Sequence, residues 1–219
     1  MLRLLFTKSG NAVWISHLDT MRLFQRAFKR SGLLLTHTQG FNPRPSVSIA
    51  LPLSVGVESR CELLDFQLDN QDVPCEQIKE RLNSSLVEGI TVLEVYNDGR
   101  KLKDLALLQC TLTLEYDQGV PCQAADEIRQ LFMADELLVD KKGKNGITQQ
   151  DLIPLIKSLQ IEQSNPNALL LEATVCCQNP SLNPNQIAQA ILKYLPHLYP
   201  DFVICKRIEL LTDDGNIFR

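Results

Sequence analysis

Hydrophobic and polar positions alternate along several short segments of the chain, and stretches with a helical repeat separate these segments. Alternation with a period of two, or a short apolar run, predicts a strand, whereas apolar residues three or four apart predict a helix. The first hundred residues therefore contain two predicted helices, one after Ser16 and one after Pro74. Strands are predicted at residues 2–7, 33–38, 46–50, 62–68 and 90–96, with 12–15 as a continuation of the first or a further short strand.

The second half of the chain repeats this order. Helices are predicted at residues 124–133 and after Pro184, and strands at 108–116, 136–139, 168–176 and 203–211. Residues 152–163 are ambiguous because Pro154 interrupts them. The order β-α-β-β-α-β thus occurs twice, which predicts an α+β protein of two ferredoxin-like halves, each with an antiparallel sheet. The polar stretch 97–104 places the boundary between a first half, 1–100, and a second half, 101–219.

The first predicted helix carries two stripes. Ser16 suits the N-cap, Asp19 lies at the capping-box position, and Gly32 suits the left-handed residue that ends a helix. Leu18, Met21, Phe24 and Phe28 recur at helical spacing and predict the buried face. A row of cations, spaced at i, i+4, i+7 and i+8, flanks it: Arg22, Arg26, Lys29 and Arg30.

Composition narrows the class of protein. Hydrophobic residues make up 44% of the chain and charged residues 22%, as in ordinary globular proteins. No apolar run approaches the ~18 residues that span a bilayer, and residues 1–7 are too short for a signal peptide. Seven cysteines without a CxxC pair indicate reduced thiols, so we expect a cytoplasmic protein with no metal site. No nucleotide-binding or cofactor motif is present, and we expect no cofactor.

Charge is distributed unevenly. Residues 1–60 carry eight Lys and Arg against two Asp and Glu, or 8 − 2 = +6, and the remainder carries 14 − 24 = −10. A basic region on an acidic protein can attract phosphate groups while the rest of the molecule keeps it soluble. The N-terminal third is therefore predicted to bind an anionic partner.

The segment Gly40-Phe41-Asn42-Pro43-Arg44-Pro45 cannot form regular structure, because its prolines prevent a helix or a ladder. Proline preorganises a loop, so Arg44 is suited to a bidentate phosphate contact. Phe41 could stack on a base or fill the core, and the core is the expected position. The predicted nucleic-acid-binding residues are Arg22, Arg26, Lys29, Arg30, Phe41, Asn42 and Arg44. Residues 141–144 form a further basic loop.

Three residues support an alternative function. His17 starts the first helix, His37 lies near the end of the next predicted strand, and Lys8 ends the first strand. Two histidines that act as base and acid beside a lysine suffice for metal-independent RNA cleavage. The alternatives are therefore an endoribonuclease and, for the same histidines, a purely structural role.

Residues 38–59, which contain the loop and the following Leu51-Pro52-Leu53-Ser54-Val55-Gly56, resemble the radical SAM-linked protein family, as do residues 4–30 with Ser16-His17-Leu18-Asp19. Members of that family are domains of unknown function, found alone or fused C-terminally to cobalamin-binding radical SAM proteins. The resemblance implies a partner that is a radical SAM enzyme. The leading hypothesis is a non-catalytic RNA-binding module that presents tRNA, rRNA or another structured RNA. A docking domain for the radical SAM partner, with Phe41, Pro43 and Pro45 at its surface, is the third possibility.

Overall fold

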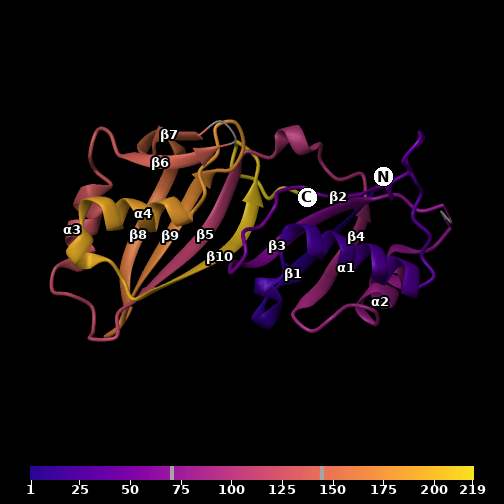
Figure 1. The fold of residues 1–219 in the computed structure, drawn as a ribbon, viewed down its shortest axis with the longest axis horizontal. Coiled ribbons are helices and arrows are strands. Elements are labelled where there is room, and N and C mark those ends of the chain that lie inside the picture. Colours follow the sequence, from indigo (N-terminus) through magenta and orange to yellow (C-terminus); the bar gives the residue numbers. More distant parts are fainter. Residues whose placement is uncertain (70–71, 144–145) are drawn as a thin grey trace. The chain divides into compact units, whose positions relative to one another are not determined.

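A computed structural model describes residues 1–69, 72–143 and 146–219 (Figure 1). The chain divides into two compact units, the first formed by residues 1–102 with Arg219 and the second by residues 103–218. In the part of the chain that the structure describes, no helix is long and apolar enough to cross a membrane.

The first unit is an antiparallel sheet with two helices. Its strand order is β4-β1-β3-β2, and every neighbouring pair is antiparallel. A short 3-10 helix, Gly10–Trp14, joins the first strand to the first helix. The elements are β1 (Leu2–Lys8), α1 (His17–Arg30), β2 (Val47–Ile49), β3 (Glu58–Phe66), α2 (Cys75–Asn83) and β4 (Ile90–Asn97).

The core of the first unit lies between its sheet and its helices, which lie on the same face of the sheet (Figure 1). Phe24 and Phe28 of α1 are fully buried, and their rings contact Phe6 and Phe66 of the sheet at centroid distances of 4.7 and 4.9 Å. Burying an aromatic side chain stabilises a fold by about 2 kcal/mol or more, so these contacts fix α1 on the sheet. The outward face of α1 is thereby set as well.

The second unit repeats the strand order of the first. Its sheet runs β10-β5-β9-β8, again antiparallel throughout, and α3 contacts both β8 and α4. A separate hairpin, β6–β7, is inserted between α3 and β8. The elements are β5 (Leu107–Glu115), α3 (Ala124–Leu131), β6 (Leu138–Gly143), β7 (Gly146–Asp151), β8 (Ile156–Asn165), β9 (Ala168–Cys176), α4 (Asn185–Tyr194) and β10 (Phe202–Leu211). When the hairpin is left out and the four remaining strands of each unit are numbered in chain order, both sheets have the strand order fourth, first, third, second.

The α+β class is confirmed, and so are the ends of α1. The Ser16 hydroxyl accepts a hydrogen bond from the Asp19 amide at 3.2 Å, and Gly32 has a φ of +70°. The strand predicted at residues 33–38 is wrong, because that segment makes only the isolated bridges Leu35–Leu68 and His37–Pro45. Pro43 and Pro45 lack the amide hydrogens that a longer ladder needs. Residues 12–14 lie in the 3-10 helix and Ile15 caps it, so the strand predicted at residues 12–15 is wrong.

Two glycines with positive φ test how tightly the turn before α1 is packed. A Cβ at Gly89 would lie 2.4 Å from the Ser9 carbonyl oxygen and 2.9 Å from Ala12 Cβ, whereas a Cβ at Gly32 meets nothing within 4 Å. We predict that Gly32→Ala lowers the free energy of unfolding by about 1 kcal/mol, the cost of a left-handed alanine. Gly89→Ala should cost at least about 2 kcal/mol more, through the collision. Equilibrium urea unfolding measures both, and equal losses would contradict the packing described for this turn.

Candidate nucleic-acid interface

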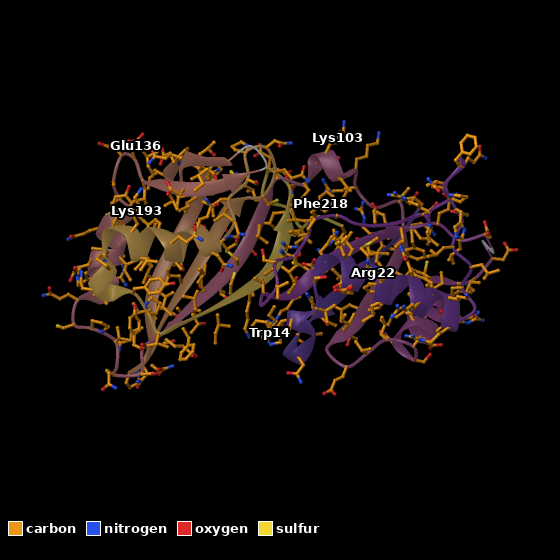
Figure 2. All side chains as sticks on the ribbon, in the orientation of Figure 1. Trp14, Arg22, Lys103, Glu136, Lys193 and Phe218 are labelled. Atoms are coloured by element: carbon orange, nitrogen blue, oxygen red, sulfur yellow. The ribbon has the colours of Figure 1, made fainter. Side chains whose placement is uncertain are left out.

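The exposed face of α1 is a row of cations. Arg22, Arg26, Lys29 and Arg30 all lie on the solvent side of the helix, opposite the buried Phe24 and Phe28. Figure 2 labels Arg22 on this helix. We call these four residues the α1 face. They repel one another, so the row is stabilised by any anion that lies along it.

Two members of the α1 face have partners within the protein. Arg22 Nη1 lies 2.9 Å from Asp19 Oδ1, and Arg30 Nη2 donates to the Ser85 carbonyl oxygen at 2.5 Å. Within the described residues, the side chains of Arg26 and Lys29 make no hydrogen bond or ion pair. A hydrogen bond from Ser16, followed by that from Arg22, holds the pKa of the exposed Asp19 below its usual range. Asp19 is therefore ionised at neutral pH and offsets one charge of the row.

No other acid follows Asp19 in the sequence until Glu58. Residues 20–57 contain five Lys and Arg and no Asp or Glu. The sequence count of +6 still overstates the surface charge of residues 1–60, because two of its cations are buried. Arg3 makes a bidentate ion pair with Asp65, at 2.6 and 3.0 Å, and Lys8 lies in the interior. The exposed cations of residues 1–60 are Arg22, Arg26, Lys29, Arg30, Arg44 and Arg60.

Residues 36–46 form a second feature, which we call the loop arm. Ser46 donates its amide hydrogen to the Thr36 carbonyl oxygen and Thr38 donates to the Arg44 carbonyl oxygen, both at 2.8 Å. The Arg44 amide donates to the Thr38 hydroxyl at 3.0 Å. These bonds fix the base of the arm, so the ends of the tip segment 39–43 are held in place.

The tip of the loop arm presents the predicted residues to solvent. Phe41 is fully exposed, so the expectation that it fills the core is wrong. Asn42 and Arg44 are exposed too, and within the described residues the Arg44 side chain has no hydrogen bond or ion pair. An exposed Phe costs hydrophobic free energy, because no described residue covers its ring.

The loop arm and the α1 face are separate patches. Figure 1 shows the segment between α1 and β2 extending beyond β2 and away from α1. Its hydrogen bonds run within the arm and to the end of β3, where Thr36 donates to the Gln67 carbonyl oxygen at 2.9 Å. The predicted residues thus divide into four on the helix and three on the arm. The prediction of a loop at residues 141–144 is wrong for residues 141–143, which belong to β6, and Lys144 lies outside the described residues.

A small cavity lies beneath the first turn of α1. Lys8 is 2% exposed and donates from Nζ to the Ile15 carbonyl oxygen at 2.5 Å. Glu62, equally buried, accepts a hydrogen bond from the Ser59 hydroxyl at 2.6 Å. Burial lowers the pKa of the Lys8 ammonium, and the nearby Glu62 carboxylate partly opposes that shift. The cavity is lined by Phe6, Lys8, His17, Thr20, Ile49, Leu53 and Glu62.

Of the three candidate catalytic residues, His17 and Lys8 line this cavity together. His37 is exposed in the loop arm and does not line it. Glu62 was missed by the sequence reasoning, although a charged residue between Cys61 and Leu63 in a predicted strand was the available signal. Trp14 is 70% exposed, and it is not among the predicted site residues because the sequence predicts a strand at residues 12–15.

Three cysteines of the second unit, Cys110, Cys177 and Cys205, are buried. Burial raises the pKa of the Cys110 thiol to about 12 and those of Cys177 and Cys205 to about 11, so these thiols stay protonated and unreactive at neutral pH. Among the described residues, no group of three or more His, Cys, Asp and Glu could hold a metal ion.

Burial of Lys8 should make the stability of the protein depend on pH. Its pKa is lower in the folded protein than its ordinary value of 10.5, so between these values the unfolded chain binds more protons. The penalty for burying the charged Lys8 is full below the folded pKa and disappears as the pH rises toward 10.5. The free energy of unfolding of the unsubstituted protein minus that of Lys8→Met should therefore increase as the pH rises toward 10.5. Urea unfolding at several pH values measures it, and a constant difference would contradict it.

Comparison with known proteins gives one family. A model of the family described as "Uncharacterized protein conserved in bacteria (DUF2344)" matches residues 1–184 of the chain. No curated protein matches.

Among solved structures, a chain of the "Crystal Structure of a Cbf5-Nop10-Gar1 Complex" is similar, with a TM-score of 0.52 and 10% sequence identity. The match covers 95% of this chain and 48% of that chain, so this chain spans about half of its length. The likeness is one of fold alone. The "Crystal Structure of an Unknown Protein from Galdieria sulphuraria" matches with a TM-score of 0.27 and 13% identity, over 94% of this chain and 95% of that one.

Proposed function

We propose that the α1 face carries the function of this protein. The chain belongs to the family of uncharacterized proteins conserved in bacteria (DUF2344), and the description of that family assigns no activity. The protein is an RNA-binding accessory module that holds the phosphate backbone against the outward side of α1. It is not the catalyst of the reaction it serves. Its partners are an RNA, such as tRNA or rRNA, and a radical SAM enzyme.

One observation carries the proposal: four exposed cations share one face of α1, in a segment, residues 20–57, that has no carboxylate. From Arg22 to Arg30 the row extends about 12 Å along the helix. A row of this length fits a short run of phosphates, and each contact releases a condensed counterion, which favours binding. Asp19 neutralises one cation at most, so the row stays positive when the rest of the molecule is acidic.

The strand orders support a finer statement of the fold. Each unit has the element order β-α-β-β-α-β and the strand order fourth, first, third, second. We infer that both are ferredoxin-like, and that the β6–β7 hairpin is an insertion in the second. In the first unit this arrangement leaves the side of α1 opposite the sheet open to a ligand.

The loop arm supplies the second contact of the proposal. Phe41 at its tip is available to stack on a base, and Arg44 beside it is available for a phosphate. An RNA that is bound at both patches has to extend from one to the other. The binding of a structured RNA is thereby favoured over that of a very short strand.

The alternatives have less support. His17 and Lys8 line one cavity and His37 lies in the loop arm, so the described contacts do not favour a two-histidine cleavage site. The radical SAM partner rests on the sequence resemblance, both for an accessory module and for a docking domain with Phe41, Pro43 and Pro45 at its surface.

Neutralising two cations of the α1 face tests the proposal. We predict that Arg22→Gln with Arg26→Gln weakens RNA binding at least tenfold at low salt, and lowers the slope of log affinity against log salt by about 1.4, because two phosphate contacts are lost. Fluorescence anisotropy of a labelled tRNA at several salt concentrations gives both quantities.

The matched control changes the same charge on the other helix of the unit. Lys79→Gln with Arg81→Gln on α2, where Glu76 and Glu80 lie nearby, should leave affinity and slope close to those of the unsubstituted protein. If both pairs of substitutions weaken RNA binding equally, the weakening is a general effect of charge and is not specific to the α1 face. If the unsubstituted protein retains no RNA at low salt, the proposed function is wrong.

A further inference from the structure

Trp14 is an exposed aromatic residue at the start of α1 and the single tryptophan of the chain. It ends the 3-10 helix Gly10–Trp14, three residues before the first residue of α1, and is 70% exposed. Part of its ring packs on Gly56, where an added Cβ would lie only 3.3 Å from the ring atom Cζ3. The ring is thus supported by backbone, and most of its surface stays in water.

The backbone around Trp14 is held in place from several sides. The Gly56 amide donates to the Val13 carbonyl oxygen at 2.9 Å, and the Ile15 amide donates to the Ala12 carbonyl oxygen at 3.0 Å. Lys8 Nζ donates to the Ile15 carbonyl oxygen from within the core. Since the residues on both sides of Trp14 are bonded, the backbone that carries the ring has little freedom left to lose when a ligand contacts it.

Trp14 adjoins one end of the α1 face. Leu18 is 65% exposed and lies one helical turn before Arg22, so an exposed stripe leads from the start of the helix to the cations. The prediction that Leu18 lies on the buried face of α1 is therefore wrong. Figure 2 labels Trp14 at the N-terminal end of α1 and Arg22 farther along it.

We propose that Trp14 is a stacking platform for an unpaired base, and that the α1 face therefore takes single-stranded RNA in preference to a duplex. A base in a duplex is already stacked and paired, whereas an unpaired base can lay its π face on an indole. The cations hold the backbone of either form, so the preference comes from the ring. This inference rests on the proposed function and names the class of RNA segment that the site accepts.

The chain provides its own reporter for the test. Because Trp14 is the single tryptophan, its intrinsic fluorescence reports on one ring. The unsubstituted protein is titrated with a mixed-sequence single-stranded RNA of about twelve nucleotides, and with the same strand annealed to its complement. We expect the single strand to quench Trp14 and to bind roughly tenfold more tightly than the duplex, a ratio inside the range of one base–aromatic stack.

Variants separate the ring from the charge. Trp14→Ala, followed by anisotropy with labelled RNA, should lose roughly tenfold in affinity for the single strand and keep its affinity for the duplex, whereas Trp14→Phe should retain most of the preference. Phe202→Ala, which removes another exposed aromatic residue, is the matched control and should change neither affinity.

The outcomes distinguish this inference from the function it rests on. The proposal that Trp14 stacks on a base is wrong if RNA binds but Trp14 fluorescence stays unchanged, or if single strand and duplex quench it equally and bind equally. Either result leaves the proposal that RNA binds at the α1 face intact. If neither of these short RNAs binds while the labelled tRNA does, the inference fails and the proposed function stands; if the tRNA does not bind either, both fail. The titration uses the unsubstituted protein, so its result does not depend on how the variants fold.

Discussion

The buried ammonium of Lys8 ties the first strand to the start of the first helix, and the candidate interface depends on that tie. Nζ reaches the Ile15 carbonyl oxygen at 2.5 Å, one residue after Trp14 and two before α1 begins. An ammonium in the interior is costly unless its hydrogen bonds and a nearby carboxylate offset the loss of water. Glu62 lines the same cavity and favours the charged form. The turn between Lys8 and His17 is thereby fixed, and with it the position of Trp14 and of the α1 face.

The charged side chains of the first unit are either buried or exposed, and the two groups have different roles. Arg3 is bound to Asp65, and Lys8 is bonded inside the core, so both contribute to the fold and nothing to the surface. All of the exposed cations of residues 1–60 except Arg60 lie in residues 20–57, a segment without carboxylates, and remain available to an external anion. A count of charges along the chain cannot make this division. The side-chain contacts do, and they leave a smaller but better placed positive surface than the count of +6 suggested.

Much of the fold could be predicted because local signals agreed with it. The Ser16 cap, the glycine after α1 and the apolar repeat of Phe24 and Phe28 define one helix without reference to the rest of the chain. The segment 33–38 alternates as a strand does, but its neighbour is a proline-rich return that cannot extend a ladder, and pairing depends on the neighbour. The separation of the loop arm from α1 and the exposure of Phe41 could not be predicted, since both depend on where the chain returns to the sheet.

The proposed function requires that RNA lies along the outward side of α1. Heteronuclear NMR of the isotopically labelled chain, titrated with a single-stranded RNA, tests it most directly, because each backbone amide reports its own contact. We expect shift changes to concentrate in residues 14–30, with a second and smaller group in the loop arm, and the Trp14 indole resonance to move with the first group. Changes confined to the second unit, or to the sheet, with residues 14–30 unaffected, would contradict it.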